Sequence, residues 1–231
     1  QPMLGTVPAF VLAITLAGLC GLVSGVLVGY VGINPIIATL GVGTIVLGIV
    51  QSAVGGVIVY GTNPATADFV KGRIFGIPVL VLIFAVVAVA GHLVLSRSYW
   101  GRWTMATGGN PIAAEASAIP VRAVRAGAFV LTGLCGGLSG ALLGLTLQSA
   151  RPLVGVGYEF SAITAVVVGG ISISGGSGSV PRAIIGLLFV QLLTNVMVLN
   201  SVRTPDQGFV LGLLIAAAVA LDMALRRRGI A

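Results

Sequence analysis

The sequence predicts an all-α protein, a polytopic transmembrane helical bundle with about seven spans. Of its 231 residues, only 12 are Lys or Arg and 5 are Asp or Glu, so charged residues make up 7% of the chain. Soluble domains carry about 25% charged residues. The hydrophobic share is 57% and the mean hydropathy is +1.14. This composition argues against a cytosolic enzyme, a disulfide scaffold, a disordered chain and a nucleic-acid binder.

Charge-free stretches locate the candidate spans, because a membrane-spanning helix needs about 20 mostly apolar residues. Residues 1–67 carry no charge, and the turn signal Gly32-Ile33-Asn34-Pro35 divides them into two spans. The apolar stretch after Ser161 is short and runs into a Gly-Ser-rich segment, so we expect a short or broken helix buried in protein or lining a cavity. A re-entrant loop is the alternative there. The predicted spans of this single domain, residues 1–231, are 7–30, 36–57, 78–95, 126–147, 161–180, 183–199 and 209–225.

The basic residues set the expected orientation, because Lys and Arg concentrate in cytoplasmic loops. Residues 96–125 carry four Arg residues, and the tail carries Arg226, Arg227 and Arg228. We therefore expect this loop and the C-terminus to be cytoplasmic. Counting spans back places Gln1 outside, and the chain has no initiating Met. We expect an N-terminally truncated chain that has lost earlier spans.

Glycine is abundant, with 35 residues, about twice the usual share. Helices in lipid gain little from apolarity, so small residues that let backbones approach closely favour their packing. Gly25 and Gly29 form one small-xxx-small pair, and Gly136 and Gly140 form another. The sequence therefore predicts a tightly packed bundle.

Uncharged polar residues inside the spans are candidates for a translocation pathway, since polar groups at membrane depth are costly. Amides and hydroxyls suit a neutral, hydroxyl-rich solute, although hydrogen bonding between helices is the simpler explanation for each residue. Cys20, Cys135 and His92 lie singly in apolar runs, so we expect no disulfide, no metal site and no cofactor. The pathway candidates are Thr39, Thr44, Gln51 and Asn195.

The loop after the third span contains one predicted helix, from Pro111 to Ala118. Asn110 is a favourable N-cap, and Pro111 suits the first helical position. Glu115 is expected in the early turns, where negative charge suits the helix dipole, and Pro120 is expected to end the helix. So short a helix is unstable alone. It is either an interfacial connector or a docking helix for a soluble subunit.

Three segments of the chain together match the pattern of a known family. The loop contributes Ala106-Thr107-Gly108-Gly109-Asn110, Ala113-Ala114, Ser117 and Ile119; the other segments are Gly155-Val156-Gly157-Tyr158-Glu159 followed by the Gly-rich run 169–179, and Pro35-Ile36-Ile37-Ala38-Thr39-Leu40-Gly41. They resemble the permeases of ABC-type importers of the ribose and monosaccharide class. The family usually has Gly between this Ser and this Ile. Ala118 stands there, a change that would lengthen the helix.

The resemblance implies a permease subunit of an ATP-driven importer of a pentose, hexose or related sugar in the bacterial inner membrane. The implied partners are cytoplasmic ATP-binding subunits, an extracytoplasmic solute-binding protein and a second permease copy, identical or related. The chain contains no P-loop pattern, so we do not expect it to hydrolyse ATP. The implied ATPase-coupling residues are Gly109, Asn110, Pro111, Ala113, Ala114, Glu115 and Ser117, and the Gly-rich segment contributes Gly169, Gly170, Ser172, Gly175, Gly176 and Gly178.

Alternatives stay open. A branched-chain amino-acid or nucleoside permease of the same superfamily is the close competitor, although a zwitterionic substrate favours charges or helix ends near its path. An ion-coupled secondary transporter usually has ionisable residues at mid-membrane or inverted repeats, and the spans indicate neither. An intramembrane enzyme needs a nucleophile with a base, and His92 has no apparent partner.

Overall fold

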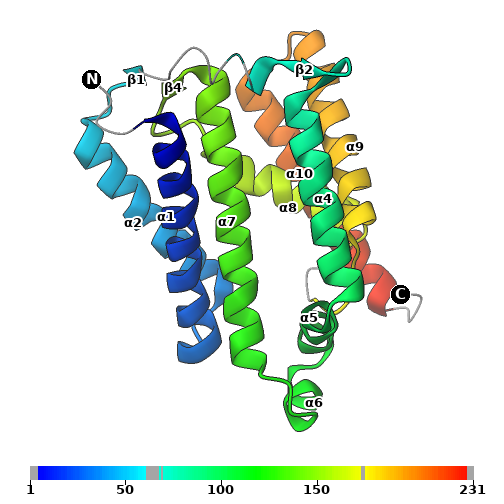
Figure 1. Cartoon of the computed structure of the whole chain (residues 1–231). Coiled ribbons are helices and arrows are strands. Elements are labelled where there is room, and N and C mark those ends of the chain that lie inside the picture. Colours follow the sequence, from blue (N-terminus) through cyan, green and yellow to red (C-terminus); the bar gives the residue numbers. More distant parts are fainter. Residues whose placement is uncertain (1–4, 61–67, 69, 173–174, 228–231) are drawn as a thin grey trace. The chain divides into compact units, whose positions relative to one another are not determined.

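The protein is built from apolar helices (Figure 1), and the computed structural model describes residues 5–60, 68, 70–172 and 175–227. Within these residues, five helical stretches are long and apolar enough to cross a membrane, so the prediction of an all-α polytopic membrane protein is confirmed. The five stretches are Val7–Val31, Pro35–Val54, Val79–Arg97, Val121–Leu147 and Val180–Leu199.

Two of the seven predicted spans correspond to shorter apolar helices, Tyr158–Val168 and the stretch Pro205–Ala220. The helices are α1 (Thr6–Val26), the π-helical turn η1 (Leu27–Val31), α2 (Pro35–Val54), α4 (Val79–Arg97), α5 (Tyr99–Gly109), α6 (Pro111–Ala116), α7 (Val121–Leu147), α8 (Tyr158–Val168), α9 (Val180–Leu199) and α10 (Thr204–Arg227).

The chain folds into two compact units. The first unit comprises Gln1–Val89 and Ala114–Gly155, and the second comprises Ala90–Ala113 and Val156–Ala231. The three boundaries fall inside α4, inside α6 and between β4 (Ser149–Ala150) and α8. Each unit therefore has its own packing, built from segments far apart in the sequence.

In the first unit, α1 and α7 lie side by side along a seam of glycines (Figure 1). A Cβ atom added to Gly25 would lie 2.7 Å from the carbonyl oxygen of Ala126, and one on Gly29 would lie 2.7 Å from that of Arg122. The predicted packing role of Gly25 and Gly29 is confirmed. The second predicted pair is not used in this way, because Gly136 and Gly140 have no atom within 4 Å of an added Cβ. This seam is what holds α1 against α7.

The turn between the first two spans lies where the sequence places it. Gly32 adopts a left-handed conformation with φ of 83° and ends η1. Asn34 Oδ1 then accepts a hydrogen bond of 2.9 Å from the Ile36 N–H, and Pro35 occupies the first position of α2. This polar cap and the proline together start a new helix.

Two short antiparallel ladders lie in the first unit. β1 (Val59–Tyr60) pairs with β4 (Ser149–Ala150), placing Val59 opposite Ala150. β2 (Arg73–Ile74) pairs with β3 (Ile77–Pro78) through a two-residue turn, Phe75-Gly76, with φ of 52° and 81°. Positive φ at both central residues is the geometry of a type I′ hairpin turn, and it leaves the Phe75 side chain 99% exposed.

In the second unit, α8 packs against α9 and α10. A Cβ on Gly186 of α9 would collide with the carbonyl oxygen of Ala165 in α8, and a Cβ on Gly169 would collide with that of Arg182. The two helices therefore touch through their backbones. Since α8 has 11 residues, it rises only about 16 Å, roughly half the hydrocarbon thickness. The structure has a short helix in this region, but it ends at Val168, and the described residues 169–172 and 175–179 of the predicted span 161–180 are not helical.

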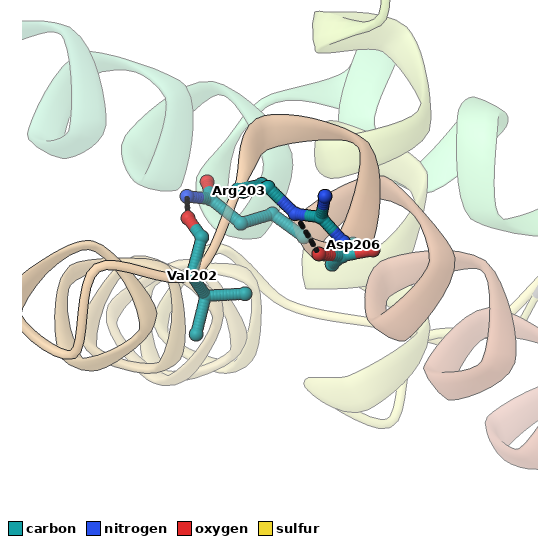
Figure 2. A network of polar contacts seen from close by, with 4 residues as sticks. Val202, Arg203 and Asp206 are labelled. Atoms are coloured by element: carbon teal, nitrogen blue, oxygen red, sulfur yellow. Dashed lines mark hydrogen bonds and ion pairs between the residues drawn. The ribbon is translucent and has the colours of Figure 1, made fainter.

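The connection from α9 to α10 is held by polar contacts. Arg203 Nε donates to Asp206 Oδ2 at 3.2 Å (Figure 2). Gln207 Nε2 donates to the carbonyl oxygen of Val202 at 2.8 Å. The side chains of Arg203 and Asp206 are 85% and 53% exposed, so this ion pair contributes little stability.

Candidate functional site

The loop after α4 begins with a helix that the sequence analysis missed, α5. Ser98 caps it, since its Oγ accepts a hydrogen bond of 3.0 Å from the Gly101 N–H. Gly101 is buried, and a Cβ there would collide with the carbonyl oxygen of Leu95. Only glycine lets α5 turn back so closely against the end of α4. The signal was the N-cap Ser98, obscured by three glycines that weaken helix propensity.

The predicted coupling helix is present as α6, and its start is as expected. Asn110 Oδ1 accepts a hydrogen bond of 3.1 Å from the Ala113 N–H, and Pro111 is the first helical residue. The expected place of Glu115 is wrong. It is the fifth residue of a helix of six, so it lies near the C-terminal end, where the helix dipole gives a carboxylate no favourable interaction.

α6 ends at Ala116, two residues earlier than predicted. The Ile119 N–H donates to the Ala114 carbonyl at 3.1 Å, and the Ala118 N–H donates to the Glu115 carbonyl at 3.0 Å. These two bonds form a Schellman motif, in which the first residue beyond the C-cap adopts a left-handed conformation. Ala118 supplies it with φ of 59°. The expectation that alanine lengthens the helix is therefore wrong. The helix ends here although Ala118 must adopt a left-handed backbone conformation that favours glycine.

Ala118→Gly is expected to stabilise the protein by about 1 kcal/mol, because a left-handed conformation costs a non-glycine residue about that much. The measurement is thermal unfolding of the purified chain in detergent. Ala116→Gly is the matched control, because glycine inside a helix is destabilising by up to about 1 kcal/mol. If both changes lower the melting temperature alike, the left-handed strain at Ala118 is not real.

The exposed side of α6 carries an apolar residue. Ile112 is 82% exposed, and Glu115 is exposed beside it, whereas Ala114 is only 3% exposed. The Ile112 side chain is therefore available for contact with another protein. Ile112 is not among the coupling residues predicted from the sequence. Its signal was that Ile112 is the one large apolar side chain in the predicted helix 111–118.

The Gly-rich segment lies between α8 and α9, and its described residues, 169–172 and 175–179, are called here the closed loop because hydrogen bonds join the two parts. The Ser172 N–H donates to the Ser177 carbonyl at 3.3 Å, and the Gly175 N–H donates to the Ser172 carbonyl at 3.2 Å. Residues other than glycine rarely adopt the left-handed backbone conformations found along this segment. These occur at Gly170, Gly175, Gly176 and Gly178, with φ of 74°, 91°, 77° and 154°.

This loop contacts the end of α5. The Gly175 and Gly176 backbone lies directly against Gly108, and an open pocket of about 320 Å³ lies beside the contact, lined by Thr104, Met105 and Ala183 among others. The structure thus brings together two segments that the sequence analysis identified separately, the Gly-rich segment and the residues leading into α6.

The predicted pathway residues do not gather at one place. Thr44 and Gln51 are seven residues apart and share a face of α2, whereas Thr39 lies about 140° away around the helix. Thr39 borders a pocket of about 370 Å³ in the first unit, between α1, α2 and α7. Asn195 is exposed on α9 in the second unit.

The threonine hydroxyls are satisfied within their own helix. Thr39 Oγ1 donates to the Pro35 carbonyl at 2.9 Å, and Thr44 Oγ1 donates to the Leu40 carbonyl at 2.8 Å. The pocket beside Thr39 also contains Cys20, Ser24 and Thr132, which the sequence analysis did not propose as pathway residues. Only the folded structure shows that these side chains line the same pocket as Thr39.

Comparison with known proteins shows which family the chain belongs to. Residues 2–219 match the model of the family described as "Branched-chain amino acid transport system / permease component". The chain belongs to this permease family. Within it, the permease is 35% identical over 93% of its length to the D-allose transport system permease protein of Escherichia coli (strain K12). It is 37% identical over 86% to the ribose import permease protein of Bacillus subtilis (strain 168), and 32% identical over 87% to the L-arabinose transport system permease protein of E. coli (strain K12).

The predicted resemblance to permeases of the ribose and monosaccharide class is confirmed by these relatives. The permease spans 61 to 66% of the length of these three proteins. No solved structure matches it.

Proposed function

We propose that this permease is the membrane-spanning subunit of an ATP-binding-cassette importer in the bacterial inner membrane, and that it translocates a pentose, a hexose or a related sugar. The observation that carries the proposal is α6, a capped six-residue helix with an exposed Ile112. It supplies an apolar contact point for a soluble subunit. The sugar substrate is inferred from relatives named for allose, ribose and arabinose.

The proposed assembly divides the work between subunits. Two cytoplasmic ATP-binding subunits hydrolyse ATP, a solute-binding protein delivers the sugar from outside, and a second permease copy completes the pore. Residues 96–125 and the C-terminus face the cytoplasm, as their Arg content favours. Within α6 and its flanks, Ile112 and Glu115 contact the ATP-binding subunit. Asn110 and Ala114 hold the helix in place, because Asn110 caps it and Ala114 is buried.

Two measurements on the tagged protein test this function. The first is purification in mild detergent, with mass spectrometry of the proteins recovered, where we expect an ATPase with a P-loop. The second is uptake of labelled D-ribose, D-allose, L-arabinose and L-leucine by cells with and without the chain. We expect sugar uptake that stops when ATP is depleted.

The other outcomes identify the alternatives. Uptake of leucine in place of a sugar would assign the permease to amino-acid import, which the name of the family model favours. Recovery of the chain alone, with uptake that persists after ATP depletion, would overturn the importer and favour a secondary transporter.

A further inference from the structure

Two backbones touch at the end of α5, with no side chain between them. A Cβ on Gly108 would collide with the backbone nitrogen of Gly176 and lie 3.2 Å from its Cα atom. In the opposite direction, a Cβ on Gly176 would lie 2.5 Å from the Cα atom of Gly109 and 2.6 Å from its nitrogen. Cβ atoms essentially never come this close to other heavy atoms. This contact, called here the Gly108–Gly176 contact, therefore requires glycine on both sides.

Each side of the contact leads to a different part of the permease. On one side, Gly109 is the last residue of α5, and Asn110 alone separates it from α6. The Asn110 side chain is bonded to the Ala113 N–H, so the end of α5 and the first turn of α6 are held together. On the other side, Gly176 belongs to the closed loop that joins α8 to α9, and Gly178 in that loop packs against the Ile171 side chain.

α8 and α9 are themselves held backbone to backbone, through Gly169 and Gly186. A displacement of the loop therefore acts on two helices at once. Thr107 is 5% exposed, and its Oγ1 has no hydrogen-bond partner among the described residues.

From this arrangement we propose that Gly108 and Gly176 are positioning residues for transport. Movement of α6, driven by the ATP-binding subunit, reaches α8 and α9 through the Gly108–Gly176 contact and the closed loop. The inference rests on the proposed function, and it adds the Gly-rich segment to that function as the element that receives the movement. A side chain at Gly108 would push the loop away from α5 and interrupt the transmission.

The test uses the complete complex with its ATP-binding and solute-binding subunits. Gly108→Ala is the chosen variant, because Gly108 is helical and alanine adds only bulk. We expect normal recovery of the ATPase, retained ATP hydrolysis, and a fall of about tenfold or more in sugar taken up per ATP hydrolysed. Gly91→Ala in α4 is the matched control, since a Cβ there meets no atom within 4 Å. It should leave all three quantities unchanged.

A second variant keeps the inference testable if Gly108→Ala fails to accumulate. Ala183→Leu on α9 places a larger side chain in the open pocket between α5 and the loop, so it pushes the loop away from α5 without adding an atom at either glycine. We expect sugar uptake per ATP to fall while thermal stability stays the same or rises. A purely structural role for this region predicts no such loss.

The outcomes separate this inference from the proposed function. If the unmodified complex recovers no ATPase and shows no ATP-dependent uptake, the proposed function fails. If the unmodified complex works and Gly108→Ala accumulates with unchanged uptake per ATP, the inference is overturned. Unchanged uptake per ATP in Ala183→Leu would overturn it as well where Gly108→Ala does not accumulate.

Discussion

Ile112→Asp is expected to prevent recovery of the ATP-binding subunit with the permease, while leaving the amount of permease in the membrane unchanged. Ile112 is 82% exposed, so its replacement disturbs no packing within the chain. Burying an isoleucine against a partner contributes about 1.5–3 kcal/mol, which corresponds to roughly tenfold to a hundredfold in affinity. An unpaired aspartate in an apolar contact adds a further cost. The measurement is the ratio of ATPase to permease after purification.

Phe75→Asp is the matched control for this experiment. Phe75 is also a fully exposed apolar residue, and its left-handed conformation accommodates aspartate. On the proposed orientation its hairpin faces outside, so ATPase recovery should not change. Glu115→Arg should weaken recovery as Ile112→Asp does, because it reverses a charge on the same exposed side of α6. A normal ATPase ratio in both α6 variants would remove α6 from the docking site.

Gly25→Ala is expected to have the largest effect on stability, about 2 kcal/mol or more, since overpacking a tight contact costs about 1–3 kcal/mol. Its Cβ would lie 2.7 Å from the Ala126 carbonyl oxygen and 2.9 Å from the Ala126 Cα atom. These are backbone atoms, so no rotamer change can relieve the contact, and α1 must separate from α7. The measurement is thermal unfolding in detergent together with the amount of chain in the membrane.

Gly136→Ala serves as the control for Gly25→Ala. Both glycines are helical and lie in the first unit, and Gly136 has no atom within 4 Å of an added Cβ. It should be neutral or slightly stabilising, because alanine favours a helix over glycine. Equal destabilisation by the two changes would mean that the glycine seam does not hold α1 to α7.

Much of the fold could be predicted from the sequence, because long apolar runs and turn residues carry local signals. Gly32, Asn34 and Pro35 stop one helix and start the next without help from the rest of the chain. α7 begins at Val121, five residues before the predicted span 126–147, because the predicted loop 96–125 includes the charged residues Arg122 and Arg125. Both Arg side chains are exposed while Val121 and Val124 are buried. A short amphipathic turn therefore extends the apolar helix.

The candidate site was only partly predictable, since its main features depend on contacts distant in the sequence. The N-cap of α6 is local, and it was predicted correctly from Asn110. The left-handed Ala118 could not be predicted, because alanine has no preference for that conformation. The Gly108–Gly176 contact joins residues nearly seventy positions apart. Likewise, Thr39 borders a pocket and Thr44 does not. This difference depends on how α2 packs in the first unit, and the sequence of α2 alone does not predict it.

The glycine seam between α1 and α7 has a consequence for the entropy of assembly. Ordering a side chain at a helix contact costs up to about 2 kcal/mol of rotamer freedom, and glycine and alanine have none to lose. In lipid, no hydrophobic gain offsets such a cost. Gly21, Gly25 and Gly133 therefore let dispersion forces between the two backbones act without an opposing entropic term from side chains. The absence of a side-chain entropy cost at these glycines therefore stabilises the first unit together with the contacts that they make.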